Sequence, residues 1–326
     1  YMEKIFITGG AGYVGAELTK HLLEKNYEVT VFDLFIYGQT LGEHKNLKLI
    51  KGDIRNQELL KKYINGHDAV IHLACISNDP SFELNPTLGK EINLDAFEPL
   101  VKISRENNVR KFIYASSSSV YGIKTEKNVS EDMSLEPLTD YSKFKAECER
   151  ILFNYKTDAF ITSVIRPATV CGYSSRQRLD LVVNILTNLA YHKREISVFG
   201  GEQLRPNIHI KDMIRSYSFL LEQDEKKING EIFNVGYENK TINQLANEVK
   251  SVVGDDIKVV KVPSNDNRSY HISSSKIHDL LGFKNNFTII DAIKDLKLAF
   301  ENKKIINSFE DINFFNIKKM QNIKLK

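Results

Sequence analysis

The sequence predicts an α/β protein with a doubly wound parallel sheet and a smaller C-terminal substrate-binding lobe. Short apolar segments alternate with segments whose apolar residues recur near the helical period, and this alternation indicates right-handed parallel units. A glycine-rich loop joins the first strand to the first helix. After Arg166-Pro167 the regular alternation ends, which indicates a second part of different construction.

The expected elements follow from apolar patterning. Residues 3–8 form an apolar run before the glycines, and Val14, Leu18 and Leu22 lie at helical spacing after them. By the same criteria, the remaining strands of the first half are expected at 28–32, 47–50, 69–73, 111–115 and 160–165, and its helices at 13–25, 56–64, 89–107 and 140–155. The second half is expected to hold helices at 178–191, 241–252, 274–281 and 289–302, strands at 230–235 and 257–261, and short segments at 196–199 and 206–210.

Composition excludes several classes of protein. The 326 residues suffice for about two domains, with 42% hydrophobic and 27% charged residues, as in globular proteins. Lysine and arginine (45) nearly balance aspartate and glutamate (42), so neither a nucleic acid nor a membrane surface is an expected partner. No apolar run approaches the ~20 residues of a membrane span, and the N-terminus lacks a signal-peptide pattern. Three dispersed cysteines fit a reduced, cytoplasmic setting and provide no metal site.

The loop Thr8–Gly15 (TGGAGYVG) has the features of a dinucleotide-binding fingerprint. Gly9 permits a tight turn, Gly12 leaves room for a pyrophosphate, and Gly15 allows close packing of helix on strand. The following helix N-terminus, at Tyr13 and Val14, offers free N–H groups to phosphates. A simple structural turn is the alternative, since one glycine loop is weak support.

Asp33, at the end of the second strand, favours NAD over NADP. A carboxylate there accepts hydrogen bonds from the ribose hydroxyls and repels a 2′-phosphate, and the next basic residue is Lys45. Asp53 and Ile54 are expected to hold the adenine. The small Leu73-Ala74 step lets the cofactor cross the sheet's switch point. A solvated strand-end aspartate is the alternative for Asp33.

Tyr141 and Lys145 stand four residues apart on an expected helix and therefore face the same way. The lysine ammonium favours the phenolate and so prepares the tyrosine to act as a base. Ser116–Ser119 follow the strand 111–115, at the edge where α/β sheets bind ligands. A surface Tyr/Lys pair and a polar capping loop remain the alternatives, and polarity alone selects none of the four serines.

Together these motifs resemble the extended short-chain dehydrogenase/reductases, in the branch of NAD-dependent nucleotide-sugar epimerases and dehydratases. The resemblance covers about residues 3–300 and includes TGGAGYVG, Asp33, HLAC, YASSSSVYG and YSKFK in the family order. It implies that Tyr141 is the catalytic base, that Lys145 is its ribose-bound partner and that Ser117 is the catalytic serine. It also assigns cofactor contacts to Asn93 and Pro167.

The resemblance implies a reaction that starts with oxidation of a sugar carbon. An epimerase returns the hydride to the other face of the keto-sugar, whereas a net dehydrogenase releases the keto product. Dehydratases of the family carry an Asp-Glu pair where this chain has Ser118 and Ser119, which argues against 4,6-dehydration. We therefore expect an epimerase, with a net hexose or heptose dehydrogenase as the alternative. A redox-sensing protein without activity and a keto-sugar reductase are further alternatives.

The second half is expected to hold the nucleotide sugar. Arginine binds phosphate oxygens through a planar fork, and Arg205 and Arg268 match family positions near the substrate's nucleotide. The stretch RQRLDL, which includes Arg178, resembles a subset with a heptose-nucleotide dehydrogenase. Thr169 replaces the asparagine usual in sugar 4-epimerases, and Ser77 and Ser118 complete the expected substrate contacts.

These assignments predict a division of the chain. Residues 1–166 form an NAD-binding Rossmann-like domain, to which 206–238 return. Residues 167–205 and 239–302 form the substrate lobe, and 303–326 are a tail, either a surface helix or partly disordered. A homodimer is expected because many relatives pair through the helix that carries the tyrosine and the lysine.

Overall fold

A seven-stranded parallel sheet forms the centre of the protein in a computed structural model that describes residues 3–266 and 268–326. Its strand order is β10-β6-β5-β4-β1-β2-β3, so successive strands are added on one side of β1 up to β3 and on its other side from β4 onward. All six neighbouring pairs are parallel. The strands are β1 Lys4–Thr8, β2 Glu28–Asp33, β3 Leu47–Lys51, β4 Ala69–His72, β5 Lys111–Ala115, β6 Ile161–Pro167 and β10 Glu231–Val235. The predicted doubly wound fold is confirmed.

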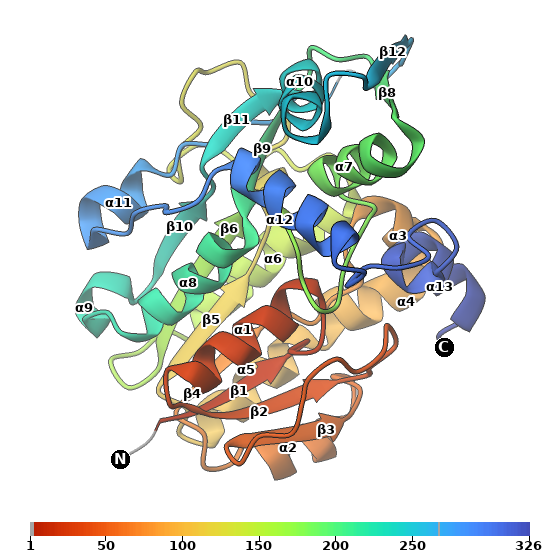
Figure 1. Ribbon diagram of the computed structural model, residues 1–326. Helices are drawn as coiled ribbons and strands as arrows, with labels where there is room; N and C mark the ends of the chain where they lie inside the picture. The colour runs from red at the N-terminus through yellow and green to blue at the C-terminus, as the bar shows by residue number, and fades with distance from the viewer. Residues whose placement is uncertain (1–2, 267) are drawn as a thin grey trace.

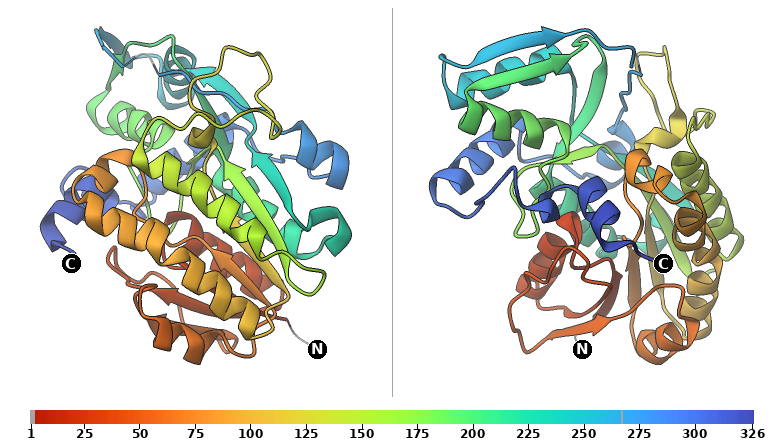
Figure 2. Two further views of the ribbon diagram at one scale, coloured as in Figure 1. Left: turned by 180° about the vertical axis from the view of Figure 1, so that it is seen from behind. Right: turned by 90° about the vertical axis from the view of Figure 1, so that its right-hand side faces the viewer.

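Helices cover both faces of this sheet (Figures 1 and 2). One face carries α1 (Tyr13–Glu24) and α8 (Ile210–Leu221), which pack on each other over the apolar side chains of β1 and β2. The other carries α2 (Gln57–Ile64), α5 (Phe97–Glu106) and α6 (Asp140–Asn154) over a second apolar cluster. The sheet is therefore buried on both sides, as a parallel sheet requires.

The smaller lobe is built on two short sheets. One has the order β11-β9-β7, with β7 Thr169–Cys171, β9 Leu204–His209 and β11 Glu238–Thr241, and the other pairs β8 Glu195–Phe199 with β12 Lys258–Val262. Its helices α7 (Val182–Lys193), α10 (Ile242–Val253) and α12 (Ile289–Glu301) enclose a separate apolar cluster. Segment 206–238 is thus shared, because β9 lies in the small sheet whereas β10 extends the large one.

Several elements differ from the sequence expectation. Helix α8 was not expected, although Ile210, Met213, Ile214 and Tyr217 recur at helical spacing and are buried. The single helix expected at 89–107 is divided into α4 (Pro86–Lys90), the π-helix η1 (Glu91–Asp95) and α5. The helix expected at 178–191 begins only at Val182.

The remaining elements are short or peripheral. They are α3 (Asp79–Glu83), the 3-10 helix η2 (Ser118–Tyr121), α9 (Glu225–Ile228), α11 (Ser275–Leu281), the 3-10 helix η3 (Ile312–Phe314) and α13 (Asn316–Ile323). The tail is ordered against the protein: Asn316 and Met320 of α13 are buried, and α13 packs on α3. Residues 303–326 thus contain a helix, which was one of the two expectations for this tail.

Candidate active site

The glycine loop packs the start of α1 tightly against β1. Gly9 has a φ of +74°, a backbone conformation that suits glycine, and its N–H donates to the Phe32 carbonyl at 2.9 Å. A Cβ on Gly15 would lie 2.1 Å from the Gly9 carbonyl oxygen, so only glycine fits there. Gly12 is the N-cap of α1 and has no capping side chain, so the first N–H groups of α1 are left for a ligand.

Asp33, at the end of β2, is held in place by backbone groups. Its carboxylate accepts hydrogen bonds from the N–H groups of Ala11 at 3.0 Å and Phe35 at 2.8 Å. Burial raises the pKa of this carboxyl above its ordinary value, and the two N–H donors oppose the rise. The carboxylate therefore lies between the glycine loop and the end of β2, where a ribose would meet it.

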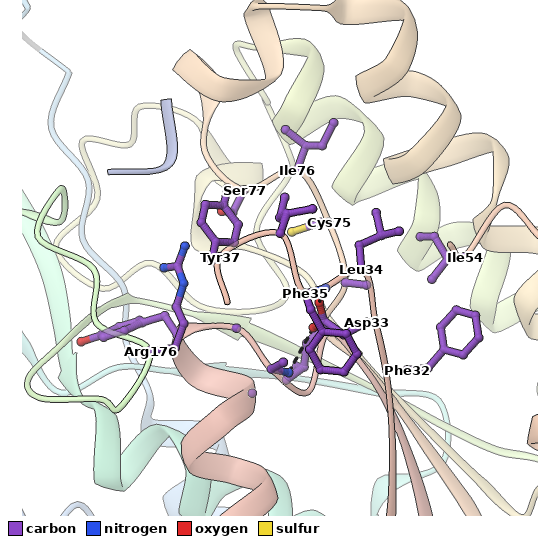
Figure 3. A pocket seen from close by; sticks show the side chains of 18 of the residues that line it. Phe32, Asp33, Leu34, Phe35, Tyr37, Ile54, Cys75, Ile76, Ser77 and Arg176 are labelled. Carbon is purple, nitrogen blue, oxygen red and sulfur yellow. Dashed lines mark hydrogen bonds between the residues drawn. The ribbon is translucent and has the colours of Figure 1, made fainter. Parts of the chain in front are cut away.

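These groups line one pocket, which we call the dinucleotide pocket (Figure 3). It lies at the carboxyl ends of β1, β2, β3 and β4, on the switch point of the sheet, where open α/β sheets bind ligands. Of the site residues expected from sequence, the pocket is lined by Gly9, Gly12, Tyr13, Val14, Gly15, Asp33, Asp53, Ile54, Leu73, Ala74, Ser77 and Arg178. Its wall also includes residues for which no role was expected, among them Phe35, Tyr37, Cys75, Arg176, Asn316 and Leu325.

Three side chains expected at the cofactor are occupied by protein partners. The Asp53 carboxylate accepts hydrogen bonds from the Arg55 guanidinium, at 2.8 to 3.1 Å. The buried Tyr13 hydroxyl donates to the Gly172 carbonyl at 2.7 Å, which ties α1 to the loop after β7. Asn93, in the π-helix, bonds the N–H and carbonyl of Ile76 at 2.8 and 3.0 Å. Asn93 therefore supports the pocket wall through Ile76 and does not line the pocket itself.

Tyr141 and Lys145 lie in the first two turns of α6 because Thr139 caps that helix, accepting from the Ser142 N–H at 3.2 Å. The Lys145 ammonium is buried, donates to the Ala115 carbonyl at 2.8 Å and lies 5.7 Å from the centre of the Tyr141 ring. The spacing expected from sequence is thus realised as a contact between a phenol and an ammonium.

Burial raises the pKa of Tyr141 to about 12, and the nearby Lys145 charge opposes the rise. Burial alone would lower the pKa of Lys145, but the Cys75 sulfur and the Tyr141 phenol raise it above its ordinary value. Cys75 also lines the dinucleotide pocket, so it connects that pocket to the Tyr141/Lys145 pair. The site thus holds a tyrosine and a lysine whose pKa values are both raised.

Ser117 begins a chain of hydrogen-bonded side chains that the sequence analysis missed. Its Oγ lies 2.8 Å from Ser119 Oγ, which lies 2.7 Å from Ser142 Oγ. Ser142 Oγ is 3.2 Å from Thr139 Oγ1, which donates to the Asp79 carboxylate at 2.6 Å. The chain therefore connects the expected catalytic serine to a carboxylate whose charge acts on Tyr141. Nothing in the local sequence pairs residues 79 and 117.

The residues expected at the sugar nucleotide fall into two places. Arg178 is buried beside the dinucleotide pocket and pairs with Asp180 at 2.8 Å. Arg205 and Arg268 lie together in the small lobe, where Arg205 donates to the Arg268 carbonyl and lies 5.4 Å from the Tyr270 ring centre. Neither Arg205 nor Arg268 lines the dinucleotide pocket.

The other expected site residues lie at strand ends near these groups. Ser118 opens η2, directly after Ser117, and is half-buried. Pro167 ends β6 and Thr169 begins β7, so both lie at the carboxyl edge of the large sheet. None of the three lines the dinucleotide pocket.

The described residues contain neither a metal-binding cluster nor a membrane-spanning helix. Within residues 3–266 and 268–326, no three His, Cys, Asp or Glu side chains are grouped so that they could hold a metal ion. In the same part of the chain, no helix has the length and apolar character needed to cross a membrane.

Comparisons with known proteins found a matching family model, similar sequences and similar structures. The family model described as "NAD dependent epimerase/dehydratase family" matches residues 5–236. An uncharacterized UDP-glucose epimerase of Bacillus subtilis, YtcB, is 31% identical over 77% of this chain and 82% of its own length. Human dTDP-D-glucose 4,6-dehydratase is 27% identical, over 86% of this chain and 85% of its own. The crystal structure of UDP-glucose 4-epimerase from Thermotoga maritima with UDP-glucose shares the fold, with a TM-score of 0.84, 24% identity, and 92% of this chain and 99% of that chain covered.

Proposed function

Because the chain belongs to the NAD-dependent epimerase/dehydratase family, we propose that it is an NAD-dependent nucleotide-sugar epimerase that works through a keto-sugar. The observation that carries the proposal is the Tyr141/Lys145 pair on α6, which Cys75 connects to the dinucleotide pocket. Ser117 is linked to the same helix through the hydroxyls of Ser119 and Ser142. A base, a cation that favours its charged form and a hydroxyl that orients the substrate are the groups that oxidation of a sugar alcohol requires.

The pocket residues fit the cofactor of the family. Gly12 and the free N–H groups of α1 suit a pyrophosphate, and the Asp33 carboxylate suits the hydroxyls of an adenosine ribose. When bound, NAD accepts a hydride from a sugar carbon and can return it. We propose that Asp33 selects NAD over NADP.

The chain's own residues accept and return the proton of the sugar hydroxyl. Tyr141 as phenolate takes the proton from the sugar hydroxyl while the carbon loses its hydride, and the oxygen becomes a carbonyl. Lys145, fixed by the Ala115 carbonyl, stabilises the phenolate before this step. Ser117 holds the reacting oxygen by a hydrogen bond. For epimerisation, the keto-sugar turns over and Tyr141 gives the proton back.

Net oxidation is the second candidate. Arg176 and Arg178, in the stretch that resembles a subset with a heptose-nucleotide dehydrogenase, lie in the wall of the dinucleotide pocket. A 4,6-dehydratase is less well supported, since Ser118 and Ser119 provide no carboxylic acid to assist loss of water. We propose that Arg205 and Arg268 hold the nucleotide, that Thr169 and Ser77 lie near the substrate, and that the enzyme is a cytoplasmic homodimer.

The division of labour between the lobes is also a proposal. Residues 1–166 with β10 would bind NAD, and residues 167–205 with 239–302 would bind the nucleotide sugar. The position of β10 in the large sheet supports the first half of this division.

A panel of UDP-, GDP-, CDP- and dTDP-sugars, with the products resolved by NMR, tests the proposed reaction. An epimerase gives a new sugar isomer with no net change in absorbance at 340 nm. Steady NADH production, or turnover only with an added keto-acid, would establish net oxidation instead. Tyr141→Phe should abolish product, and Tyr155→Phe, at the other end of α6, is the matched control.

A further inference from the structure

Arg176 is a buried cation without a carboxylate partner among the described residues. Its side chain is in the wall of the dinucleotide pocket, and the residue is only 4% exposed. Its guanidinium lies 3.7 Å from the ring centre of Tyr37 (Figure 3). In the described part of the chain, it donates one hydrogen bond, from Nη2 to Asn316 Oδ1 at 2.9 Å, and its buried Nε has no partner.

The neighbouring charges do not neutralise it. The Asp180 carboxylate accepts two hydrogen bonds from the Arg178 guanidinium, from Nε at 2.8 Å and from Nη2 at 3.2 Å, and is therefore paired with Arg178. The Asp33 carboxylate is bonded by the N–H groups of Ala11 and Phe35. Burial and, next, the Arg178 charge lower the pKa of Arg176 to about 10, although Tyr37, Asp180 and Asp33 oppose the fall. Since a buried charge without a counter-charge is costly, the pocket is suited to an anionic group.

Asn316 of the C-terminal segment holds this arginine in place. Besides accepting from Arg176, its amide donates to Ser77 Oγ at 2.7 Å, and its backbone N–H donates to Asp180 at 2.9 Å. One side chain from residues 303–326 thus bridges the loop after β4 and the loop after β7, both of which contribute residues to the pocket wall.

The rest of the segment continues along the same pocket. The Phe314 carbonyl accepts a hydrogen bond from the Leu179 N–H at 2.9 Å. Met320 is buried in the apolar cluster that α2, α5 and α6 cover, and Leu325 lines the pocket. Arg55 bonds the Lys326 carbonyl at 2.7 Å as well as Asp53. The C-terminal segment therefore reaches the pocket at Asn316, on the Arg176 side, and at Leu325, whose neighbour Lys326 is bonded by Arg55.

We propose that Arg176, presented by Asn316, binds the diphosphate group of the dinucleotide, and that residues 303–326 close the pocket over it. This rests on the assignment of NAD to the pocket and is independent of the reaction catalysed. Guanidinium nitrogens suit this role because their fork matches phosphate oxygens, and the buried Nε of Arg176 has no partner among the described residues. The segment then slows release of the cofactor.

Binding measurements on protein stripped of cofactor test the proposal. NADH, ADP-ribose, adenosine and UDP are titrated against wild type, Arg176→Gln and the control Arg150→Gln, which is an exposed arginine on α6. We expect Arg176→Gln to weaken the binding of NADH and ADP-ribose by about tenfold or more, since both carry the diphosphate. The binding of adenosine should be unchanged. Arg150→Gln should change none of them.

Other patterns would overturn it. Loss of UDP binding with NADH unchanged would place Arg176 at the substrate, and equal loss of adenosine would show a general collapse of the pocket.

A second variant tests the segment without removing the charge. Asn316→Ala should speed exchange of resident NAD for isotopically labelled NAD several-fold, with the melting temperature little changed. An unchanged exchange rate would refute the role of residues 303–326. Because these readouts need no turnover, an inactive protein that passes them would contradict only the proposed reaction.

Discussion

Lys145→Met isolates the electrostatic contribution of the ammonium to the base. The methionine has similar length and removes the charge that lies 5.7 Å from the Tyr141 ring centre. For unit charges about 6 Å apart at an effective dielectric of ~20, Coulomb's law gives ~3 kcal/mol, or about two pKa units. Because the charge favours the phenolate, its loss raises the pKa of Tyr141, which burial already holds at about 12.

The assay is the pH dependence of sugar oxidation at saturating NAD. Since the phenolate is the active form, the rate rises with pH through the pKa of Tyr141, and Lys145→Met should move this limb to higher pH. At neutral pH the rate should fall about 100-fold, in proportion to the phenolate lost. Lys143→Met, an exposed neighbour on the same helix, is the control. A profile that keeps its position and height in Lys145→Met would refute the role of the ammonium.

Three further predictions concern the loop, the missed carboxylate and the core. Gly15→Ala places a Cβ 2.1 Å from a carbonyl oxygen and should reduce the free energy of unfolding in urea by about 2 kcal/mol; an unchanged midpoint would contradict the packing argument. Asp79→Asn removes a charge that raises the pKa of Tyr141, so the pH–rate limb should move to lower pH, and a shift upward would argue against their proximity. Glu149→Gln leaves Arg166 buried without its 2.7 Å partner and should cost about 3 kcal/mol in the same urea measurement, whereas a cost near zero would show that the pair is solvated.

Features that are local in sequence were predictable. The glycine loop, Asp33 at a strand end and the four-residue spacing of Tyr141 and Lys145 are each set within one strand–turn–helix unit. The alternation of strands and helices sufficed for the doubly wound sheet, which the structure confirms. It did not suffice for α8, although Ile210 and Met213 begin a clear helical pattern. That pattern directly follows the short segment expected at 206–210, and no element was predicted between 210 and 230.

Features made by distant contacts were not predictable. Arg176 meets Asn316 across 140 residues, and Asp79 meets Thr139 across 60, so no local pattern connects them. The tail was ambiguous because its apolar residues are sparse, and it is ordered by partners that only the folded protein brings near. The division of the helix at 89–107 also depends on tertiary contacts, since the π-helix turns Asn93 toward Ile76.

A crystal structure of the protein with NAD and a nucleotide sugar tests the central claim most directly. The account predicts that the phenol oxygen of Tyr141 contacts the reacting sugar hydroxyl, with the sugar carbon roughly 3 to 3.5 Å from nicotinamide C4. A nicotinamide bound in the dinucleotide pocket but far from Tyr141, with another side chain against the sugar hydroxyl, would contradict it.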